Sequence, residues 1–421
     1  MERVVITGLG TINSLGHNVE ESFKAMLAGV CGVDTISLFD ASEYSVSIAA
    51  EVKEFDPTTV MEKKEVKKAD RFIQLGIKAA REAMLDSKLI EESAGDFRVS
   101  DAIANDFGIV SASGIGGLAT IEKNSIICEK RGPRKISPFF IPSALSNMLG
   151  GFVSIEHGLK GPNLSAGTAC AASTHAISDA AKIIMLGTAS KMLVVGAESA
   201  VCGAGVGGFA AMKALSTRND EPKKASRPFD RDRNGFVMGE GSGALILESL
   251  SSAKKRGAKI YAELLGFGES ADANHITSPV VDGPLRAMRA ALKMAKEITQ
   301  EDIKIDYVNC HGTSTPVGDQ NESIALKDFF GGKDKCPPLS SIKGQIGHCL
   351  GAAGAIEAIA SIKSLNESII APTINYENTS ENCDLDYVPN KAREAELNIV
   401  MSNNFGFGGT NASIILRKFK D

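Results

Sequence analysis

The chain alternates between short apolar runs, which are typical of buried strands, and longer stretches in which apolar residues recur with a helical period. Strands are predicted at residues 4–7, 107–112, 191–196, 243–248 and 305–308. Helices are predicted at residues 20–28, 69–85, 171–186, 284–294 and 352–365. This alternation of strand and helix along almost the whole chain predicts an α/β fold.

Length, composition and charge narrow the class of protein. The 421 residues are enough for two packed halves, and 43% hydrophobic and 23% charged residues are ordinary for a soluble globular protein. The net charge of -5 argues against a nucleic-acid-binding protein, which is normally basic. No apolar run approaches the roughly 18 residues that span a bilayer. The first strand also begins too early to leave room for a signal peptide. We therefore expect a cytoplasmic protein, or one already processed, that does not enter a membrane.

A charged stretch at residues 251–259 separates the two patterned parts of the chain. It is the best candidate for a boundary, so we expect one half over residues 1–253 and a second half over residues 254–421. No internal repeat can be recognised from residue identities alone.

Cys170 lies in the segment GTACAAS, residues 167–173, directly before a long predicted helix. The backbone N–H groups and dipole at a helix N-terminus favour a thiolate, so we expect the pKa of this thiol to fall below its ordinary value of about 8.5. The small neighbours leave room for a substrate to approach the sulfur. A buried structural cysteine fits the same pattern. Most of the other cysteines are expected to be of that kind, because no C-x-x-C spacing suggests a metal or redox site.

Two of the six histidines lie in glycine-framed loops. His311 follows the predicted strand 305–308 within NCHGTSTPVGD, and α/β folds place ligand sites at the carboxyl ends of strands. His348 ends the segment SSIKGQIGH, which also contains Lys343 and precedes a helix containing Glu357. A thiolate that accepts an acyl group and imidazoles that donate to an enolate oxygen would suit acyl transfer with carbanion formation. Histidines satisfied by turn backbone, and glycines that allow tight helix packing, explain the same residues, so the residue types alone leave this hypothesis open.

These three segments, together with NNFGFGGTN at residues 403–411, resemble the signature blocks of the β-ketoacyl-[acyl carrier protein] synthases. The resemblance runs from VVITGLG at residues 4–10 to the final glycine-rich loop, and GPRKISPFF at residues 132–140 resembles the synthase II branch in particular. It implies a thiolase-like five-layered αβαβα sandwich built from two similar halves, normally as a homodimer. It also implies an acyltransferase of fatty-acid elongation that works with acyl carrier protein (ACP). No metal, nucleotide or redox cofactor is expected, because decarboxylation drives the condensation and phosphopantetheine arrives on ACP.

The resemblance implies a role for each matching residue. Cys170 resembles the acylated nucleophile, and His311 and His348 match the pair that polarises the malonyl thioester. Lys343 matches the lysine that organises charge around them, and Glu357 is similar to its usual partner. The remaining matches are Phe407, whose backbone N–H would join that of Cys170 in an oxyanion hole, Gly408 beside it in the substrate-binding loop, and Thr313 and Thr315, which would hold phosphopantetheine.

One position departs from the family pattern. Ser111 stands where the synthase II branch often has a bulky aliphatic residue. That side chain usually lines the far end of the acyl pocket across the dimer interface, so the preferred acyl length is left open.

Lys64, Lys67 and Lys68 have i, i+3, i+4 spacing, which would place three ammonium groups on one side of a helix. The segment resembles the docking helix of the family, with Lys213 contributing from elsewhere. ACP is acidic whereas this chain carries a net negative charge, so we expect a local basic face at the encounter.

Three other interpretations are weighed against this one. A standalone polyketide ketosynthase shares the chemistry. A biosynthetic thiolase shares the fold but uses a second cysteine as base, a role for which Cys349 is the candidate. A non-catalytic partner of the chain-length-factor kind usually lacks the nucleophile, so Cys170 argues against it.

Overall fold

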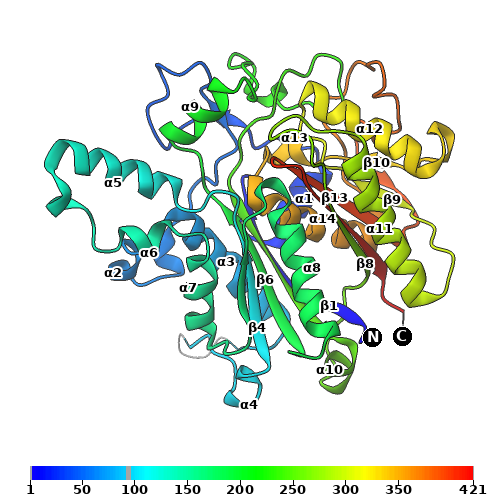
Figure 1. Ribbon diagram of the computed structural model, residues 1–421, viewed down its shortest axis with the longest axis horizontal. Coiled ribbons are helices and arrows are strands. Elements are labelled where there is room, and N and C mark those ends of the chain that lie inside the picture. The colour runs from blue at the N-terminus through cyan, green and yellow to red at the C-terminus, as the bar shows by residue number, and fades with distance from the viewer. Residues whose placement is uncertain (1, 92–95, 421) are drawn as a thin grey trace.

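The computed structural model describes residues 2–91 and 96–420 (Figure 1). Ten strands form one continuous sheet in the order β10-β9-β13-β14-β8-β1-β7-β6-β4-β5. The first half of the chain supplies β1 (Val4–Asn13), β4 (Phe107–Ala112), β5 (Asn163–Ala166), β6 (Lys191–Glu198) and β7 (Gly241–Ser249). The second half supplies β8 (Ala262–Ala271), β9 (Tyr307–Asn309), β10 (Leu339–Ser340), β13 (Ile399–Gly406) and β14 (Thr410–Lys418).

The two sets of five strands have the same topology. Numbered within its own set, each follows the order 3-2-4-5-1. In each set the strands numbered 3, 2 and 4 are parallel to one another, and the pairings of 4 with 5 and of 5 with 1 are antiparallel. The sets meet where residues 4–6 of β1 pair with residues 262–264 of β8. The chain thus contains a structural repeat that its residue identities do not reveal.

Helices cover both outer faces and fill the space between the two halves. α3 (Arg71–Asp86) and α7 (Met148–His157) pack on first-half strands, and α11 (Asp282–Thr299) packs on second-half strands with α12 (Pro316–Phe330) against it. α8 (Ala172–Met185) and α14 (Ala353–Glu367) contact each other and strands of both halves. Figure 1 shows α3 and α7 at the left, α11 and α12 at the right, and α8 and α14 between them. This arrangement confirms the predicted five-layered sandwich.

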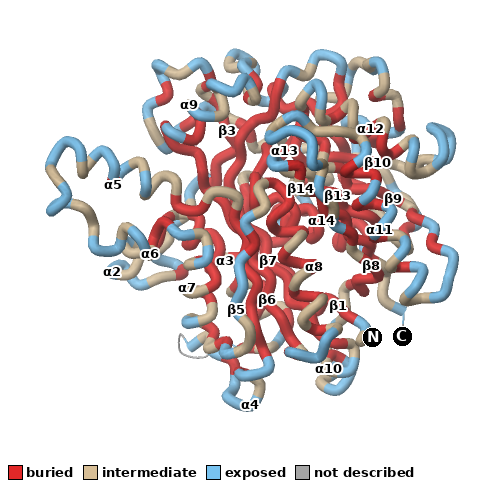
Figure 2. Tube along the Cα trace, in the orientation of Figure 1, coloured by how far each residue is buried: buried red, intermediate tan, exposed pale blue. Residues whose placement is uncertain are grey.

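Shorter elements connect these layers. The remaining helices are α1 (Val19–Leu27), α2 (Lys63–Val66), α4 (Asp101–Ala104), α5 (Leu118–Arg131), α6 (Phe140–Ala144), α9 (Gly203–Ala211), α10 (Leu250–Lys255) and α13 (Lys343–Ile346). The short strands are β2 (Asp34–Thr35), β3 (Ile48–Ala49), β11 (Ile369–Ile370) and β12 (Arg393–Glu394). The 3-10 turns are η1 (Pro57–Thr59), η2 (Pro133–Lys135), η3 (Ala169–Ala171), η4 (Pro222–Lys224), η5 (Lys333–Lys335) and η6 (Leu350–Ala352). α5 projects from the body, and Figure 2 shows most of it exposed or half-buried. Within residues 2–91 and 96–420, no helix has the length and apolarity needed to cross a membrane.

Most predicted elements are present with shifted ends. The predicted strand at residues 4–7 continues to Asn13 because its glycines let α3 lie directly against it. A Cβ at Gly10 would come within 2.1 Å of the carbonyl oxygen of Ala79. Helix α3 begins at Arg71 because the Asp70 side chain accepts a hydrogen bond from the backbone N–H of Phe72.

The predicted helical face of lysines is wrong. α2 ends at Val66, and Lys67 is already its C-cap. The chain has to leave this helix because Asp70 caps the next one, α3. Lys64, Lys67 and Lys68 therefore do not share one side of a helix.

Candidate active site

Cys170 lies where the first half of the chain turns from β5 into α8. It belongs to the 3-10 turn η3, in which Ala169 adopts a left-handed φ of +50°. The cysteine is only 9% exposed, and its Sγ lies 3.0 Å from Nε2 of His348. The turn therefore brings the sulfur of one half to an imidazole of the other half.

The two histidines are fixed through their backbones. The N–H groups of His311 and Gly312 donate to the carboxylate of Glu322 at 2.8 and 2.7 Å. The backbone N–H of His348 donates to the carbonyl of Val237 at 2.7 Å. The two imidazole rings meet edge to face with their centroids 5.4 Å apart. Both side chains are thus held next to Cys170.

Burial determines the protonation state of the two histidines and of Cys170. It lowers the pKa of His311 and of His348 well below the ordinary value, and the positive charge of Lys343 adds to the effect. Both imidazoles are therefore neutral at neutral pH. Burial also raises the pKa of the Cys170 thiol to about 12, although Lys343 and the backbone N–H groups of Phe407 and Cys170 lower it in part. The predicted lowering of this pKa is wrong, because desolvation in the closed site outweighs the helix terminus.

Lys343 and Glu357 form an ion pair sealed inside the protein. Their side chains are 1% and 0% exposed. The other carboxylate oxygen of Glu357 accepts from Nδ2 of Asn404 at 2.6 Å, and Oδ1 of Asn404 accepts from the hydroxyl of Thr174 at 2.6 Å. A buried ion pair needs such further hydrogen bonds to offset its desolvation. The pair thereby keeps a positive charge close to the histidines.

One cavity of about 310 Å³ connects the reactive groups to the surface. The predicted residues that line it are Cys170, Lys213, His311, Thr313, Thr315, His348 and Phe407. The hydroxyls of Thr313 and Thr315 lie 2.9 Å apart on its wall. Apolar side chains such as Met212, Ile276 and Val317 line it as well. The cavity therefore suits a ligand with both polar and apolar parts.

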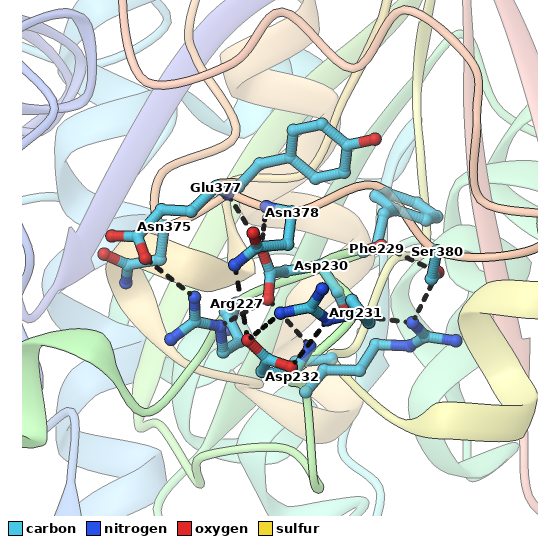
Figure 3. A network of polar contacts seen from close by, with 12 residues as sticks. Arg227, Phe229, Asp230, Arg231, Asp232, Asn375, Glu377, Asn378 and Ser380 are labelled. Atoms are coloured by element: carbon cyan, nitrogen blue, oxygen red, sulfur yellow. Dashed lines mark hydrogen bonds and ion pairs between the residues drawn. The ribbon is translucent and has the colours of Figure 1, made fainter.

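A network of polar contacts surrounds Asp230 (Figure 3), and Arg233 connects it to the loop that carries the two threonines. At its centre, the carboxylate of Asp230 accepts from the backbone N–H of Asn378 at 2.7 Å and pairs with Arg227 at 2.8 Å. Arg233 donates to the carbonyl oxygens of Asp230, at 2.8 Å, and of Thr315, at 3.1 Å. The threonine loop is thus anchored to a buried framework rather than to solvent.

Two predicted substrate-binding residues, Ser111 and Gly408, are not part of the cavity lining. Ser111 is fully buried on β4 and is not part of the cavity lining, and its hydroxyl lies 3.4 Å from the carbonyl oxygen of Leu164. Its role at the far end of an acyl pocket stays a prediction. Gly408 has a φ of +83°, and its N–H donates to the carbonyl of Ile276 at 2.7 Å. That bond ties the loop of Phe407 to the opposite wall of the cavity.

The predicted docking lysines differ in their surroundings. Lys64 and Lys68 form ion pairs with neighbouring glutamates at 2.7 and 2.6 Å. Lys67 is exposed and has no salt bridge to any residue that the structure describes. Lys213 is exposed and borders the cavity. Only Lys213 of this set lies at the cavity itself.

Cys349 does not meet the requirement of a second catalytic cysteine. It is fully buried, its Sγ faces the carbonyl oxygen of Glu240 at 3.6 Å, and it does not line the cavity. The arrangement therefore does not favour a thiolase mechanism.

The sequence analysis did not name some residues of the site. Glu322, Asn404 and Glu198 each contact a reactive residue or its immediate support. Asn404 lies inside the NNFGFGGTN block, which was a usable signal, whereas Glu198 is an acidic residue at the end of an apolar strand. Its contacts come from residues more than 80 positions away, so spacing could not indicate them.

Comparisons with known proteins agree with this geometry. The family profile described as beta-ketoacyl synthase, N-terminal domain, matches residues 1–253, and that described as beta-ketoacyl synthase, C-terminal domain, matches residues 261–377. The chain is 48% identical to a 3-oxoacyl-[acyl-carrier-protein] synthase 2 of Coxiella burnetii, over 100% of this chain and 99% of that protein.

Solved structures of ketosynthases are also similar to this chain over its full length. A beta-ketoacyl synthase from Burkholderia phymatum superposes with a TM-score of 0.91 at 34% identity, and each chain is covered completely. A type II polyketide ketosynthase in complex with its acyl-carrier protein superposes with a TM-score of 0.85 at 30% identity, again over both complete chains. With both family domains matched in order and full-length relatives of this similarity, the chain belongs to the β-ketoacyl synthase family.

Proposed function

We propose that this protein is a 3-oxoacyl-ACP synthase of fatty-acid elongation, of the synthase II type. Its family and its full-length relatives make it an acyltransferase of the condensing class. The observation that carries the proposal is the 3.0 Å contact between Cys170 Sγ and His348 Nε2, with His311 beside them in one cavity. A thiol that takes an acyl group and neutral imidazoles that stabilise an enolate are the parts that a decarboxylative condensation requires.

The first half-reaction transfers an acyl chain from ACP to Cys170. Because the thiol is protonated at neutral pH, its proton has to leave as sulfur attacks the thioester carbonyl. Nε2 of His348 lies 3.0 Å from the sulfur and accepts that proton. The backbone N–H groups of Cys170 and Phe407 stabilise the oxyanion, and loss of one such donor typically raises a barrier by about 3–4 kcal/mol. The tetrahedral intermediate expels the pantetheine thiolate, which takes the proton back from His348 and leaves as free ACP.

The second half-reaction forms the carbon–carbon bond. The malonyl thioester of a second ACP places its carbonyl oxygen between His311 and His348, whose imidazoles are neutral and each carry one N–H. For His348 to donate from Nε2, the ring passes from the Nδ1–H tautomer that accepted the thiol proton to the Nε2–H tautomer. The bond to the carboxylate breaks, carbon dioxide leaves, and the electron pair forms an enolate. The enolate carbon attacks the acyl-cysteine carbonyl, the bond between that carbon and Sγ breaks, and the released cysteine thiolate takes up one proton from solvent. The product is 3-oxoacyl-ACP, longer by two carbons.

The proposed reaction needs no metal, nucleotide or redox cofactor. Loss of carbon dioxide supplies the driving force, and phosphopantetheine enters as part of the substrate. The paired hydroxyls of Thr313 and Thr315 are the proposed contacts for its amide groups.

We also propose that the protein works as a homodimer in the cytoplasm. The support for a dimer is a set of exposed apolar side chains on the neighbouring elements α6, α7 and β5 and just beside them. They are Phe139, Ile141, Leu145, Ile155 and Leu164. β5 is also an edge strand of the sheet, and an edge strand is a ready template for pairing with a second chain. A cytoplasmic location fits eight cysteines that are all free thiols.

Turnover of the purified protein with malonyl-ACP and a series of acyl-ACPs of increasing length tests the function. We expect one condensation per acyl chain, with release of carbon dioxide and formation of 3-oxoacyl-ACP. Repeated condensation of the unreduced product would indicate a polyketide ketosynthase instead. Condensation with an acetyl thioester but not with malonyl-ACP would contradict the proposal.

A further inference from the structure

Glu198 is a carboxylate buried beside the reactive centre without a counter-ion. It ends strand β6 and is 0% exposed. Among residues 2–91 and 96–420, no lysine, arginine or histidine lies within salt-bridge distance of it. An isolated buried carboxylate is very unfavourable unless hydrogen-bond donors surround it. Its presence therefore calls for an explanation beyond packing.

Five hydrogen bonds converge on this carboxylate from two separate segments. One oxygen accepts from the hydroxyl of Ser113 at 2.8 Å and from the backbone N–H groups of Ile115 and Gly116, both at 3.3 Å. The other oxygen accepts from the N–H of Gly114 at 2.6 Å and from the N–H of Gly351 at 3.0 Å. The turn at residues 113–116 belongs to the first half of the chain, whereas Gly351 belongs to the second. Glu198 thus joins the two halves.

The two glycines are required by this contact. A Cβ at Gly114 or at Gly351 would lie 2.8 Å from the same oxygen of Glu198. A Cβ at Gly351 would also come within 2.1 Å of the backbone nitrogen of Gly114. The backbone is therefore shaped so that both N–H groups can approach the carboxylate closely.

The junction lies between the catalytic cysteine and the catalytic histidine. Gly351 follows His348 by three residues, after Leu350, which turns with a φ of +46° and lines the cavity. The carbonyl of Gly351 accepts a hydrogen bond from the hydroxyl of Ser173, which follows Cys170 by three residues at the start of α8. The Gly351 peptide is thus held on both sides, by Glu198 at its N–H and by Ser173 at its carbonyl.

We propose that Glu198 is a positioning residue of the condensing site, which anchors Gly351 to the turn at residues 113–116 and so fixes His348 relative to Cys170. The inference rests on the proposed condensing function. The charge of Glu198 has a second consequence, because it adds to burial, the main cause, in raising the pKa of the Cys170 thiol. Substitutions of Glu198 can therefore separate its effect on the position of His348 from the effect of its charge on the Cys170 thiol.

Three variants separate the two effects. Glu198→Gln keeps the size but removes the charge and one acceptor, and Glu198→Asp keeps the charge but is too short to reach both segments. Glu248→Gln is the control, because Glu248 is also 0% exposed and lies one residue before the end of a strand of the same sheet, β7, where its partner is Arg256. Condensation with acyl-ACP and malonyl-ACP and alkylation of Cys170 by iodoacetamide at about pH 7.5 are measured for each.

We expect both Glu198 variants to lose condensation kcat by about tenfold or more, with a smaller change in KM for acyl-ACP. Alkylation should become about three to ten times faster in Glu198→Gln, because the thiol pKa falls when the negative charge is removed. It should stay near the wild-type rate in Glu198→Asp. Glu248→Gln should leave both readouts unchanged.

Condensation and alkylation at wild-type rates in both Glu198 variants would overturn the inference. If Glu198→Gln does not fold, Ser173→Ala decides, because it removes the second anchor of Gly351 and should lower kcat without changing the alkylation rate. An unchanged kcat in Ser173→Ala would then reject the positioning role. Failure of the wild-type protein to condense malonyl-ACP would reject the proposed function, while the alkylation rates would still report on Glu198.

Discussion

The ion pair inside the site and the ion pairs of the predicted docking lysines differ in their physical setting. Lys343 and Glu357 are 1% and 0% exposed, and Asn404 donates a further hydrogen bond to the carboxylate. Lys64 and Glu62 are 73% and 70% exposed. Water and salt screen the surface pair over roughly 8–10 Å near physiological ionic strength, whereas the buried pair is screened much less.

This difference assigns the two regions different tasks. A charge held in the interior can act on the protonation and orientation of Cys170, His311 and His348, so its effect belongs to the chemical step. Charges on the surface act mainly on the encounter with an acidic partner, and their effect depends on salt. Changes inside should therefore alter kcat, and changes outside should alter KM for ACP-bound substrates.

The largest effect is expected at the reactive centre. Cys170→Ala should abolish condensation but leave measurable decarboxylation of malonyl-ACP, because the histidines do not need the thiol for that step. His311→Ala and His348→Ala should lose decarboxylation more severely, since each removes a donor to the enolate oxygen. Release of labelled carbon dioxide and formation of 3-oxoacyl-ACP are measured in parallel. Condensation by Cys170→Ala, or full decarboxylation by either histidine variant, would contradict these roles.

A matched pair of substitutions sharpens the comparison of ion pairs. Glu357→Gln leaves the buried Lys343 ammonium without its partner, and removal of one member of a buried pair typically costs about 3–5 kcal/mol of stability. Glu62→Gln breaks the exposed pair with Lys64 and should leave stability unchanged within error. Denaturant unfolding measures both. Equal stability of the two variants would remove the distinction between the regions.

The sequence anticipated the interior better than the surface, for a physical reason. Cys170, His311 and His348 stand in glycine-rich blocks whose resemblance to a family could be recognised, and the structure brings them together. The prediction of one helix carrying Lys64, Lys67 and Lys68 was wrong, because it was based on their spacing and took no account of Asp70. Asp70 caps the following helix, α3, and α2 ends before it, at Val66. Surface residues face water in either conformation, so their pattern constrains the backbone only weakly.

Long-range features could not be predicted from local sequence patterns, although the family resemblance implied two similar halves. The repeated strand order is visible in hydrogen-bond pairing but not in residue identities. Glu198 receives its donors from positions far away along the chain, and it lies two residues beyond the predicted strand at 191–196. The raised pKa of Cys170 likewise depends on how completely the two halves close around the sulfur. None of these properties is encoded in a local window of residues.

An intermediate effect, on KM for acyl-ACP, is expected from the predicted docking lysines. Reversal of Lys64, Lys67 and Lys68 to glutamate should raise KM for acyl-ACP by about tenfold at low salt and by less at high salt, because the encounter is electrostatic. Activity with small acyl-pantetheine substrates should change much less. An equal loss with both kinds of substrate would indicate a folding defect, and an unchanged KM for acyl-ACP would place the docking surface elsewhere.

The smallest effect concerns movement of Phe407, whose side chain is 37% exposed at the cavity. We expect its ring to move before a long acyl chain enters, with Gly408 absorbing the backbone change. Gly408 has a φ of +83°, and a Cβ there would meet none of the described atoms within 4 Å, so Gly408→Ala restricts the backbone without a clash. Gly132→Ala, at a φ of +85° and also in open space on the α5 arm, is the matched control.

Acylation rates with short and long acyl-ACPs measure this gate. Gly408→Ala should slow acylation by long chains a few-fold, and Gly132→Ala should not. Equal rates for the two variants would argue against a gate. So would a single fixed ring position, with an already open pocket, in crystals of the free and the acylated protein.

Mass spectrometry of the acyl-enzyme tests most directly whether Cys170 and the two histidines form one two-step condensing site. The purified protein is incubated with acyl-ACP alone, and the adduct is located by peptide mass. Malonyl-ACP is then added, and carbon dioxide and 3-oxoacyl-ACP are counted. We predict a single acyl adduct on Cys170, which disappears on addition of malonyl-ACP with one carbon dioxide and one 3-oxoacyl-ACP formed per adduct. An adduct on another residue, or one that persists or is merely hydrolysed when malonyl-ACP is present, would contradict the account.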